Sequence, residues 1–272
     1  MKELSLNEIK EIELEILKEI HQICEKENIR YALCDGTLLG AVRHGGFIPW
    51  DDDIDIMMPR KDYDAFIKYC KANQTKLKLL CVETDENYGY LFAKASDTNT
   101  VLYENNANSQ KIEMGVNVDI FPLDGLGDNI ESAKKEFRST SFERELVVAC
   151  NWKKFFKSKT HSLIYEPIRF AFFVLSRLVS PKKLIKSLQK KFKKNDFDNS
   201  AFSACIMGSY RLKGIFETPI YSELSEIEFE GYTFKCFKHY DEYLTSIYGD
   251  YMKLPPKEKQ VSHHTYKAYK KQ

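Results

Sequence analysis

The chain begins with apolar residues at helical spacing. Isoleucines stand at positions 9, 12, 16, 20 and 23, so they fall on one side of a helix. Ser5 and Glu8 precede most of this stripe at the spacing of a capping box, in which each side chain bonds the backbone N–H of the other residue. The pattern therefore predicts an amphipathic helix whose apolar side faces a core.

A buried strand and a short helix are expected next. Residues 29–34 (IRYALC) are mostly apolar, and a turn at Asp35-Gly36 ends this run. A helix is predicted over 37–44. It should stop at Gly45-Gly46, because glycine readily leaves the helical conformation.

Two later segments alternate polar and apolar residues. Residues 53–58 read DIDIMM before Pro59, and residues 116–121 read VNVDIF before Pro122. This alternation predicts strands with one polar face, and each strand is expected to end at its proline, which has no N–H for a ladder bond. Further expected elements are a helix over 60–73, strands near 77–82 and 90–95, a hairpin of 227–229 and 233–237 around Gly231, and a final helix near 240–248 that ends at Gly249.

Helical and strand patterns alternate over most of the chain. This predicts the α/β (α+β) class, with a mixed sheet flanked by helices. From 131 to 195 the pattern is helical and basic, and no internal repeat or low-complexity linker divides the sequence. We therefore expect residues 1–272 to form one elaborated domain that carries a helical basic insertion at 131–195.

Composition indicates a folded protein with an ordinary core. The chain has 272 residues, of which 43% are hydrophobic and 13% aromatic. No apolar run reaches the roughly 18 residues of a membrane-spanning helix, and the first residues (MKELSLNEIKEIE) lack the apolar centre of a secretory signal. A cytoplasmic protein is expected. Its seven cysteines are scattered without a C-x-x-C pair, so they are expected to be reduced core thiols.

The net charge of +1 hides a basic segment. Residues 153–194 hold thirteen Lys or Arg and one acid, Glu166, and residues 162–180 are also rich in Phe, Leu and Val. Three interpretations stay open: peripheral contact of 153–194 with the inner face of the cell membrane, a helical bundle with its aromatics inside, or contact with an anionic polymer acceptor. No nucleic-acid-binding motif accompanies the lysines, so no nucleic-acid partner is expected.

Three aspartates suggest a metal site. Asp53 and Asp55 lie two residues apart on a predicted strand, so their side chains share one face, and Asp119 lies on the later alternating strand. Two such charges 4 Å apart repel by about 4 kcal/mol at an effective dielectric of 20, which favours a divalent cation. Mg²⁺ or Mn²⁺ on these carboxylates would hold a substrate phosphate, and Asp119 would also accept the proton of an incoming hydroxyl.

Nearby residues fit a phosphate-binding role. Gly36 and Thr37 stand at a strand-to-helix turn, where exposed backbone N–H groups at a helix N-terminus can bind phosphate. Lys94 lies on a predicted strand in a largely apolar context. Phosphate binding is one explanation for its charge, and a structural ion pair is the other.

The residues around these acids also form a long motif. Residues 36–56 read GTLLGAVRHGGFIPWDDDIDI, and shorter agreement follows at Phe92-Ala93-Lys94, at 118–125 (VDIFPLDG), and at 248–252 (YGDYM) leading to Pro255-Pro256. In these motifs the chain closely resembles the LicD family, which includes bacterial phosphocholine transferases and is related to fukutin and fukutin-related protein. The resemblance spans nearly all of the chain and is weakest in the basic helical segment.

The resemblance implies a nucleotidyltransferase fold and a transferase. The enzyme would move a phospho-alcohol, in the first place phosphocholine, from a CDP-activated donor such as CDP-choline or CDP-ribitol. The acceptor would be a hydroxyl of a cell-surface glycan, such as a lipopolysaccharide, or of a lipid-linked polymer such as a teichoic-acid precursor, with release of CMP. By position, Asp53 and Asp55 match the metal-binding pair, and Asp119 matches the third carboxylate.

Other positions have competing explanations. Arg43 and His44 would approach the donor phosphates, or they complement the dipole at the end of their helix. Asp52 is an acidic neighbour of the metal pair and is counted with the substrate-binding residues. Trp50 packs in the core, or its face holds the quaternary ammonium of a choline donor. Asp124 is explained by a turn.

Two other functions would use the same pocket. A nucleotidyltransferase that attaches a nucleoside monophosphate and releases pyrophosphate would need the same acids. A catalytically silent protein that binds a nucleotide or a glycan is the third hypothesis, although binding alone does not require three mutually repelling acids. His263 and His264 lie in a basic tail that is expected to be disordered, or else to act as a lid over phosphate.

Overall fold

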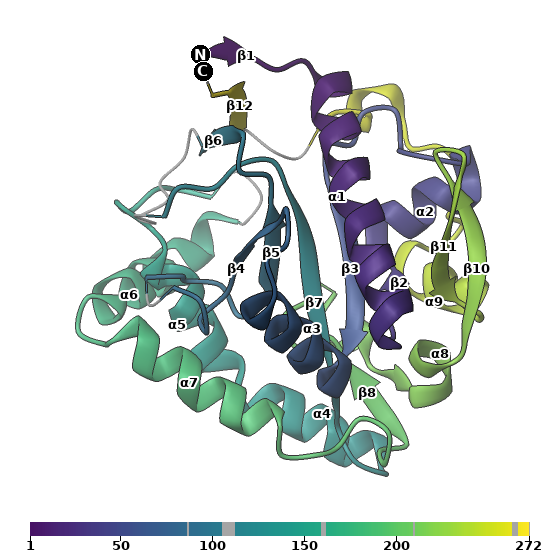
Figure 1. Ribbon diagram of the computed structural model, residues 1–272. Helices are drawn as coiled ribbons and strands as arrows, with labels where there is room; N and C mark the ends of the chain where they lie inside the picture. The colour runs from purple at the N-terminus through teal and green to yellow at the C-terminus, as the bar shows by residue number, and fades with distance from the viewer. Residues whose placement is uncertain (86, 105–111, 159–161, 209, 263–265, 272) are drawn as a thin grey trace.

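The structure is a computed structural model, and it describes residues 1–85, 87–104, 112–158, 162–208, 210–262 and 266–271. A mixed sheet runs through its centre (Figure 1). The strands of this sheet are, in spatial order, β10 (Leu224–Phe229), β11 (Tyr232–Phe237), β2 (Ala32–Leu33), β3 (Ile54–Pro59), β7 (Asn117–Gly125), β5 (Ala93–Ser96) and β4 (Lys78–Leu80). Off this path, β8 (Phe202–Ala204) pairs with the end of β7 and with β9 (Phe216–Glu217).

Helices account for most of the rest, so the expected α/β class is confirmed. The helices of the described residues are α1 (Leu6–Glu27), α2 (Asp35–His44), α3 (Arg60–Ala72), α4 (Ile130–Ser139), α5 (Ser141–Cys150), α6 (Glu166–Ser176), α7 (Pro181–Phe192), α8 (Thr218–Ser222) and α9 (Tyr240–Tyr248), with 3-10 turns η1 (Leu163–Tyr165), η2 (Arg211–Gly214) and η3 (Lys257–Lys259). α1 and α3 pack on β3 and β7 and lie in front of the sheet in Figure 1.

Several local expectations are confirmed. The capping box of Ser5 and Glu8 starts α1, and the hairpin of β10 and β11 turns at Gly231, which has a positive φ of 75°. All seven cysteines are free, and six of them are buried. Among the helices that the structure describes, none is both long and apolar enough to cross a membrane.

Strands β3 and β7 form the centre of the sheet. They run parallel and in register, with Asp55 opposite Asp119. Four fully buried apolar side chains of this pair alternate with the acids: Ile54, Ile56, Val118 and Ile120. Because successive side chains of a strand point to opposite faces, Asp55 and Asp119 share the face away from these four. The fold thus brings acids from two separate strands side by side.

The proline of β7 does not end the strand. β7 continues past Pro122 to Gly125, so the expectation that it stops at this residue is wrong. β5 pairs with β7 only as far as Ile120, and β8 begins to pair at Asp124. Pro122 lies in the gap between these partners, where β7 has an open edge that tolerates a missing N–H. β3, by contrast, ends at Pro59 as expected.

Helices α4 to α7 lie on the left and at the bottom of Figure 1 and correspond to the expected basic insertion. α4, α5 and α7 pack around a second hydrophobic cluster, which includes Phe137, Val147, Ile185 and Leu188. Most of the described residues between 131 and 195 are thus helical. The division into one domain of residues 1–272 with an insertion stays a prediction.

A second, smaller sheet joins the two ends of the chain. Its strands are β1 (Lys2–Glu3), β12 (Tyr266–Lys270) and β6 (Thr100–Glu104), and both termini lie at the top of Figure 1. The expectation of a disordered tail is wrong for β12, whose sequence YKAYK buries only Ala268 and so has little apolar pattern. His263 and His264 lie outside the described residues.

A buried ion pair holds the far end of the central strands. Arg60, the first residue of α3, donates from Nε and Nη2 to the two carboxylate oxygens of Asp124 at 2.6 and 2.7 Å. Both side chains are almost fully buried. Burial raises the pKa of Asp124, and attraction to Arg60 opposes that shift. Asp124 is thus a structural partner within β7, and its interpretation as a turn residue is wrong.

We predict that Asp124→Ala lowers the free energy of unfolding by about 3–5 kcal/mol, because it leaves the Arg60 guanidinium buried without its partner. Urea unfolding followed by circular dichroism at neutral pH measures this change. The control is Glu131→Ala, which removes an exposed pair with Lys134 and should have little effect. Equal effects of the two substitutions would contradict a structural role for the buried pair.

Candidate active site

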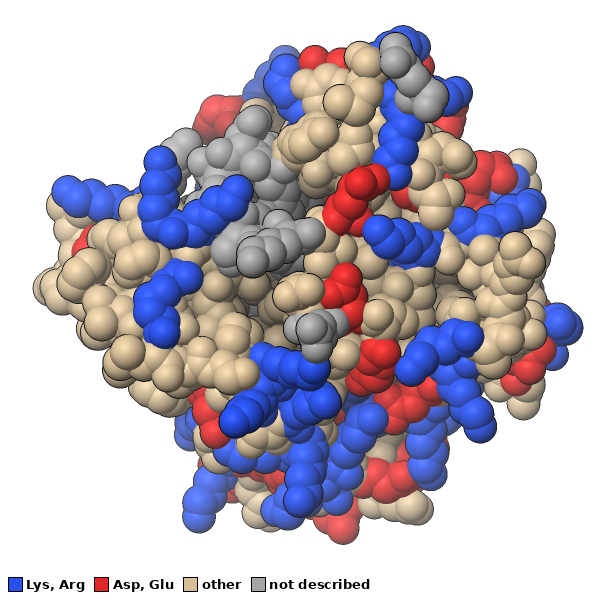
Figure 2. Space-filling model, turned by 60° about the vertical axis from the view of Figure 1, so that its left-hand side comes forward, with Lys and Arg blue, Asp and Glu red and all other residues tan. Residues whose placement is uncertain are grey.

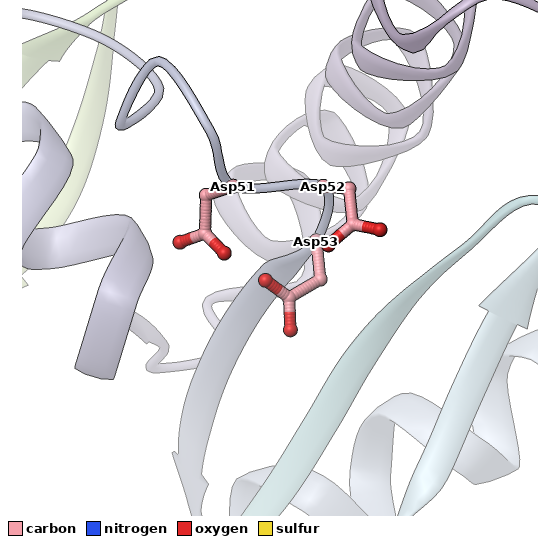
Figure 3. A group of neighbouring side chains, drawn as sticks. All are labelled: Asp51, Asp52 and Asp53. Carbon is pink, nitrogen blue, oxygen red and sulfur yellow. The ribbon is translucent and has the colours of Figure 1, made fainter. Parts of the chain in front are cut away.

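Three consecutive aspartates lie in the loop that leads from α2 into β3. Carboxylate oxygens of Asp51, Asp52 and Asp53 lie within 4.8 Å of one another, so one cation can contact all three. Figure 3 shows the side chains leaving neighbouring positions of this acidic loop at the start of β3. Asp52 is almost fully buried, whereas Asp51 and Asp53 are half-buried. Within the described ranges, no other group of His, Cys, Asp or Glu has this spacing.

The turn from β2 into α2 positions the acids. A Cβ at Gly36 would lie 2.8 Å from Oδ2 of Asp51, so glycine makes room for that carboxylate. The backbone N–H of Asp55 donates to Oγ1 of Thr37 at 2.8 Å, and the Cys34 N–H donates to the Asp55 carbonyl at 3.2 Å. Thr37 is buried and therefore acts here by holding the strand that carries Asp55.

Asp119 faces acids on one side and a lysine on the other. β7 pairs with β3 and with β5, which places Asp119 in register with both Asp55 and Lys94. Lys94 Nζ forms a short ion pair with Oδ1 of Asp119 and donates to Oδ1 of Asn117 at 3.0 Å. Burial works against the charged amine, but attraction and hydrogen bonding to Asp119, together with smaller contributions from Tyr90 and Asp55, raise the pKa of Lys94. The structural ion pair considered for Lys94 is therefore present.

The acids repel one another in a poorly solvated place. Burial raises the pKa of Asp55 well above its usual range, and Asp53 and Asp119 raise it further. Glu13 of α1 is also buried, and burial together with Asp53 raises its pKa well above the usual range. Its Oε2 atom is buried and has no hydrogen-bond partner among the residues that the structure describes. A set of hard oxygen donors with too little positive charge around it fits a divalent cation.

The acidic loop opens into a cleft of about 1120 Å³, slightly larger than the usual small-molecule site. The cleft has an acidic lining (Asp35, Asp51, Asp53, Asp55, Asp250, Glu258), a basic lining (Arg43, Lys253, Lys259) and an aromatic lining (Trp50, Phe121, Tyr210, Tyr248, Tyr251). Arg43 is held in place by a hydrogen bond from Nη1 to the Tyr251 carbonyl at 2.9 Å.

Four of the residues predicted to bind the metal or the substrate phosphates line this cleft: Gly36, Arg43, Asp53 and Asp55. Five others do not line it: Thr37, His44, Asp52, Lys94 and Asp119. Thr37 and Asp52 are buried, and His44 is exposed at the end of α2 beside Trp50. The metal set of Asp53, Asp55 and Asp119 stays a prediction, to which the structure adds Asp51 and Asp52 as oxygen donors beside Asp53.

Some residues of the site were missed from sequence. Lys253 and Lys259 line the cleft. The sequence motif at 248–256 contains Lys253 and ends shortly before Lys259, so this motif could have indicated them. Glu13 lies on the apolar side of α1, where an acid needs a reason. Tyr266 of β12 donates its hydroxyl to the Asp52 carbonyl at 2.6 Å, and no local pattern indicates this contact.

Comparison with known proteins identifies the family. Residues 28–173, more than half of the chain, match the family model described as LicD/FKTN/FKRP, nucleotidyltransferase domain. This span contains the acidic loop together with β3, β5 and β7. The chain belongs to the LicD family.

Individual relatives of this LicD-family chain cover it to different extents. The lipopolysaccharide cholinephosphotransferase LicD of Haemophilus influenzae is 34% identical over 281 aligned positions, which cover 99% of both chains. An uncharacterized protein of Rickettsia typhi is 27% identical over 205 positions, 68% of this chain and 59% of that protein. Human ribitol 5-phosphate transferase FKRP is 53% identical over 34 positions, 12% of this chain and 7% of FKRP. The chain is thus a LicD-type transferase.

One further acid of the LicD-family cleft, Asp35, is contacted by a tyrosine. Tyr243 of α9 donates its hydroxyl to Oδ1 of Asp35 in a short hydrogen bond. Burial raises the pKa of Asp35 to about 6, and the bond from Tyr243 opposes the shift. Asp35 has a positive φ of 48°, a conformation that asparagine also tolerates.

We predict that Asp35→Asn becomes more stabilising as the pH rises. Folding raises the pKa of Asp35 from 3.8 to about 6, so the wild-type protein loses stability between these values, where the unfolded chain has already released the proton. The Asn variant lacks this loss. Its free energy of unfolding relative to wild type should therefore increase from about pH 4 to about pH 6 and then stay constant.

Urea unfolding across this pH range tests the prediction. Asp241→Asn is the control, because exposed Asp241 also accepts a tyrosine hydroxyl bond, from Tyr251 at 2.6 Å. Its effect on stability should not follow the same rise. A pH-independent difference for Asp35→Asn would contradict the proposed cause.

Proposed function

We propose that this LicD-family enzyme transfers phosphocholine from CDP-choline to a hydroxyl of a lipopolysaccharide-type glycan and releases CMP. The acidic loop carries the proposal, because it opens into a cleft with basic and aromatic linings. The similarity to the Haemophilus influenzae lipopolysaccharide cholinephosphotransferase over nearly the full length supports the transferred group and the acceptor. The short similarity to ribitol 5-phosphate transferase FKRP makes CDP-ribitol the second donor to test.

The acids would hold Mg²⁺ or Mn²⁺. Carboxylate oxygens are donors that both ions accept, and the acidic loop offers three of them within 4.8 Å. Two observations support a cation at this place: the raised pKa of Asp55, and the Oε2 atom of Glu13, which has no hydrogen-bond partner within the described part of the chain. Bound cations would neutralise charge that develops on the donor phosphates.

The cleft offers separate surfaces to the two ends of the donor. Arg43, Lys253 and Lys259 are its cations, and they suit the two phosphates of a CDP group. Trp50 and Tyr251 offer ring faces, which attract a quaternary ammonium. Trp50 also packs partly against the core, so its position is compatible with both of its proposed roles.

Lys94 and Thr37 position two of the carboxylates, Asp119 and Asp55. Asp119 would accept the proton of the acceptor hydroxyl, and its ion pair with Lys94 fixes the orientation of that carboxylate. Thr37 holds Asp55 through the backbone N–H. The acceptor hydroxyl belongs to a lipopolysaccharide-type glycan in this proposal, and a teichoic-acid precursor is the alternative acceptor.

We predict that Asp55→Asn lowers CMP release by at least about a hundredfold, because the cation loses an anionic ligand. Its free energy of unfolding without metal should equal or exceed that of wild type, since a buried repelling charge is removed. CMP release with Mg²⁺ and urea unfolding in EDTA are the two measurements. Asp64→Asn is the control, an aspartate on α3 that pairs with Lys193. Full turnover by Asp55→Asn would exclude the proposed role.

We expect CMP as the nucleotide product when the enzyme is incubated with CDP-choline and Mg²⁺. Parallel reactions with CDP-ribitol and CDP-glycerol measure donor preference, and slow donor hydrolysis reports it without an acceptor. Trp50→Ala should reduce the preference for CDP-choline by roughly three- to thirtyfold if its ring contacts the ammonium.

Other products would favour other functions. Release of pyrophosphate from a nucleoside triphosphate would identify a nucleotidyltransferase. Donor binding without any product would identify a catalytically silent binding protein.

A further inference from the structure

Exposed apolar side chains gather over η1 and α6. Of the nineteen large hydrophobic side chains that are exposed in the described residues, nine lie within residues 163–179. Ile164 and Leu178 are the most exposed of these, with exposed fractions of 77% and 78%. We refer to the exposed apolar side chains of residues 163–179 as the α6 surface. An apolar surface of this kind marks a contact site.

One side of α6 packs on α5, and the other side is exposed. Phe172 and Phe173 are half-buried, with ring centres 5.2 Å from Phe142 and 6.0 Å from Phe155 respectively. The interpretation of this segment as a bundle with its aromatics inside therefore holds for these two rings and is wrong for exposed Phe170. The two charged residues of the helix pair with each other, Arg169 Nη1 with Glu166 Oε1 at 2.9 Å, and both side chains are mostly buried. The outer side of α6 is therefore apolar without charge.

Exposed lysines border the α6 surface in the sequence on both sides. Lys153, Lys154 and Lys157 precede it, and Lys182, Lys183 and Lys186 follow it. Figure 2 brings this side of the molecule forward, and much of its left half is uncharged, with Lys and Arg side chains around it. An apolar centre with a basic border matches the headgroup region of a bilayer that contains anionic lipids.

We propose that the α6 surface docks the enzyme on an anionic lipid bilayer. The eleven residues of α6 extend about 16 Å, roughly half of the 30 Å hydrocarbon layer, so the helix lies along the interface. Its apolar side chains enter the acyl boundary, and the bordering lysines contact lipid phosphates. This docking rests on the proposed function, because its role is to bring the enzyme to a lipid-anchored acceptor.

The charges favour a bilayer over other occupants. A second copy of the chain would place lysines against lysines in a two-fold contact, since Glu166 is the one acid between residues 153 and 194 and it is already paired. A soluble anionic polymer would neutralise the lysines but leave the apolar side chains in water. A bilayer with anionic lipids both neutralises the lysines and removes the apolar side chains from water.

The α6 surface is linked to the active site through α5. Asn151, which follows α5, donates from Nδ2 to the Gly89 carbonyl at 2.9 Å. The chain then continues to Tyr90 and Phe92, and the amine of Lys94 lies 5.5 and 5.3 Å from the centres of these two rings. The docking surface is thus connected to the strand whose lysine pairs with Asp119.

Vesicle flotation of the full chain tests the proposal. Phosphatidylcholine vesicles with and without added phosphatidylglycerol are the two arms. We expect binding to the anionic vesicles, weaker binding to the neutral ones, and partial release by salt. Ile168→Asp combined with Leu178→Asp should lower the bound fraction by about tenfold or more, since both exposed side chains would leave the acyl boundary.

Tyr103→Asp is the matched control. Tyr103 is exposed to 51%, close to the 55% of Ile168, but lies on β6 in the small sheet. The Tyr103→Asp variant should bind vesicles as strongly as wild type. Circular dichroism checks that all variants fold.

Four results would overturn the proposal. They are absence of vesicle binding, unchanged binding by the double variant, self-association without vesicles that the double variant abolishes, and binding to a soluble polyanion in place of vesicles. CMP release from donor without membranes is measured on the same samples. Normal release without flotation refutes only the docking, whereas flotation without release refutes only the proposed function.

Discussion

The structure depends on gathering several carboxylates in a place where they repel one another. Parallel pairing of β3 with β7 sets Asp55 opposite Asp119, and the loop before β3 adds Asp53 and its neighbours. One repelling pair costs about 4 kcal/mol at 4 Å and an effective dielectric of 20. Burial of each isoleucine on the opposite face contributes roughly 1.5–3 kcal/mol, so the sheet core offsets the repulsion and imposes the acidic site.

Local elements were readable from sequence because local chemistry decides them. The capping box at Ser5, the glycine stop of α2, and the turn at Gly231 each depend on a few adjacent residues. Once β3 and β7 are paired, the alternation of side chains along each strand places Asp55 and Asp119 on one face of the sheet. The pairing itself, and the ion pair of Lys94, depend on contacts between distant segments that no local pattern specifies.

The predictions that the structure contradicts failed for related reasons. Proline was expected to end β7, but tolerance of Pro122 depends on where β5 and β8 leave an open edge. Asp124 suggested a turn because its partner Arg60 is 64 residues away. Glu13 was overlooked although it lies among the isoleucines of α1, and an acid on an apolar stripe was the available signal. β12 was missed because this middle strand of the small sheet buries only one alanine and so has almost no apolar pattern.

The contact of Tyr266 with the Asp52 carbonyl has a consequence for how the molecule matures. The two residues are 214 positions apart, so the acidic loop leaves the ribosome long before Tyr266 is synthesised. β1 is separated from its strand partner β12 by a still longer stretch of chain, because Lys2 pairs with Lys270. A nascent chain can therefore complete every strand of its central sheet before Tyr266 reaches Asp52, so this contact is among the last to join the acidic loop.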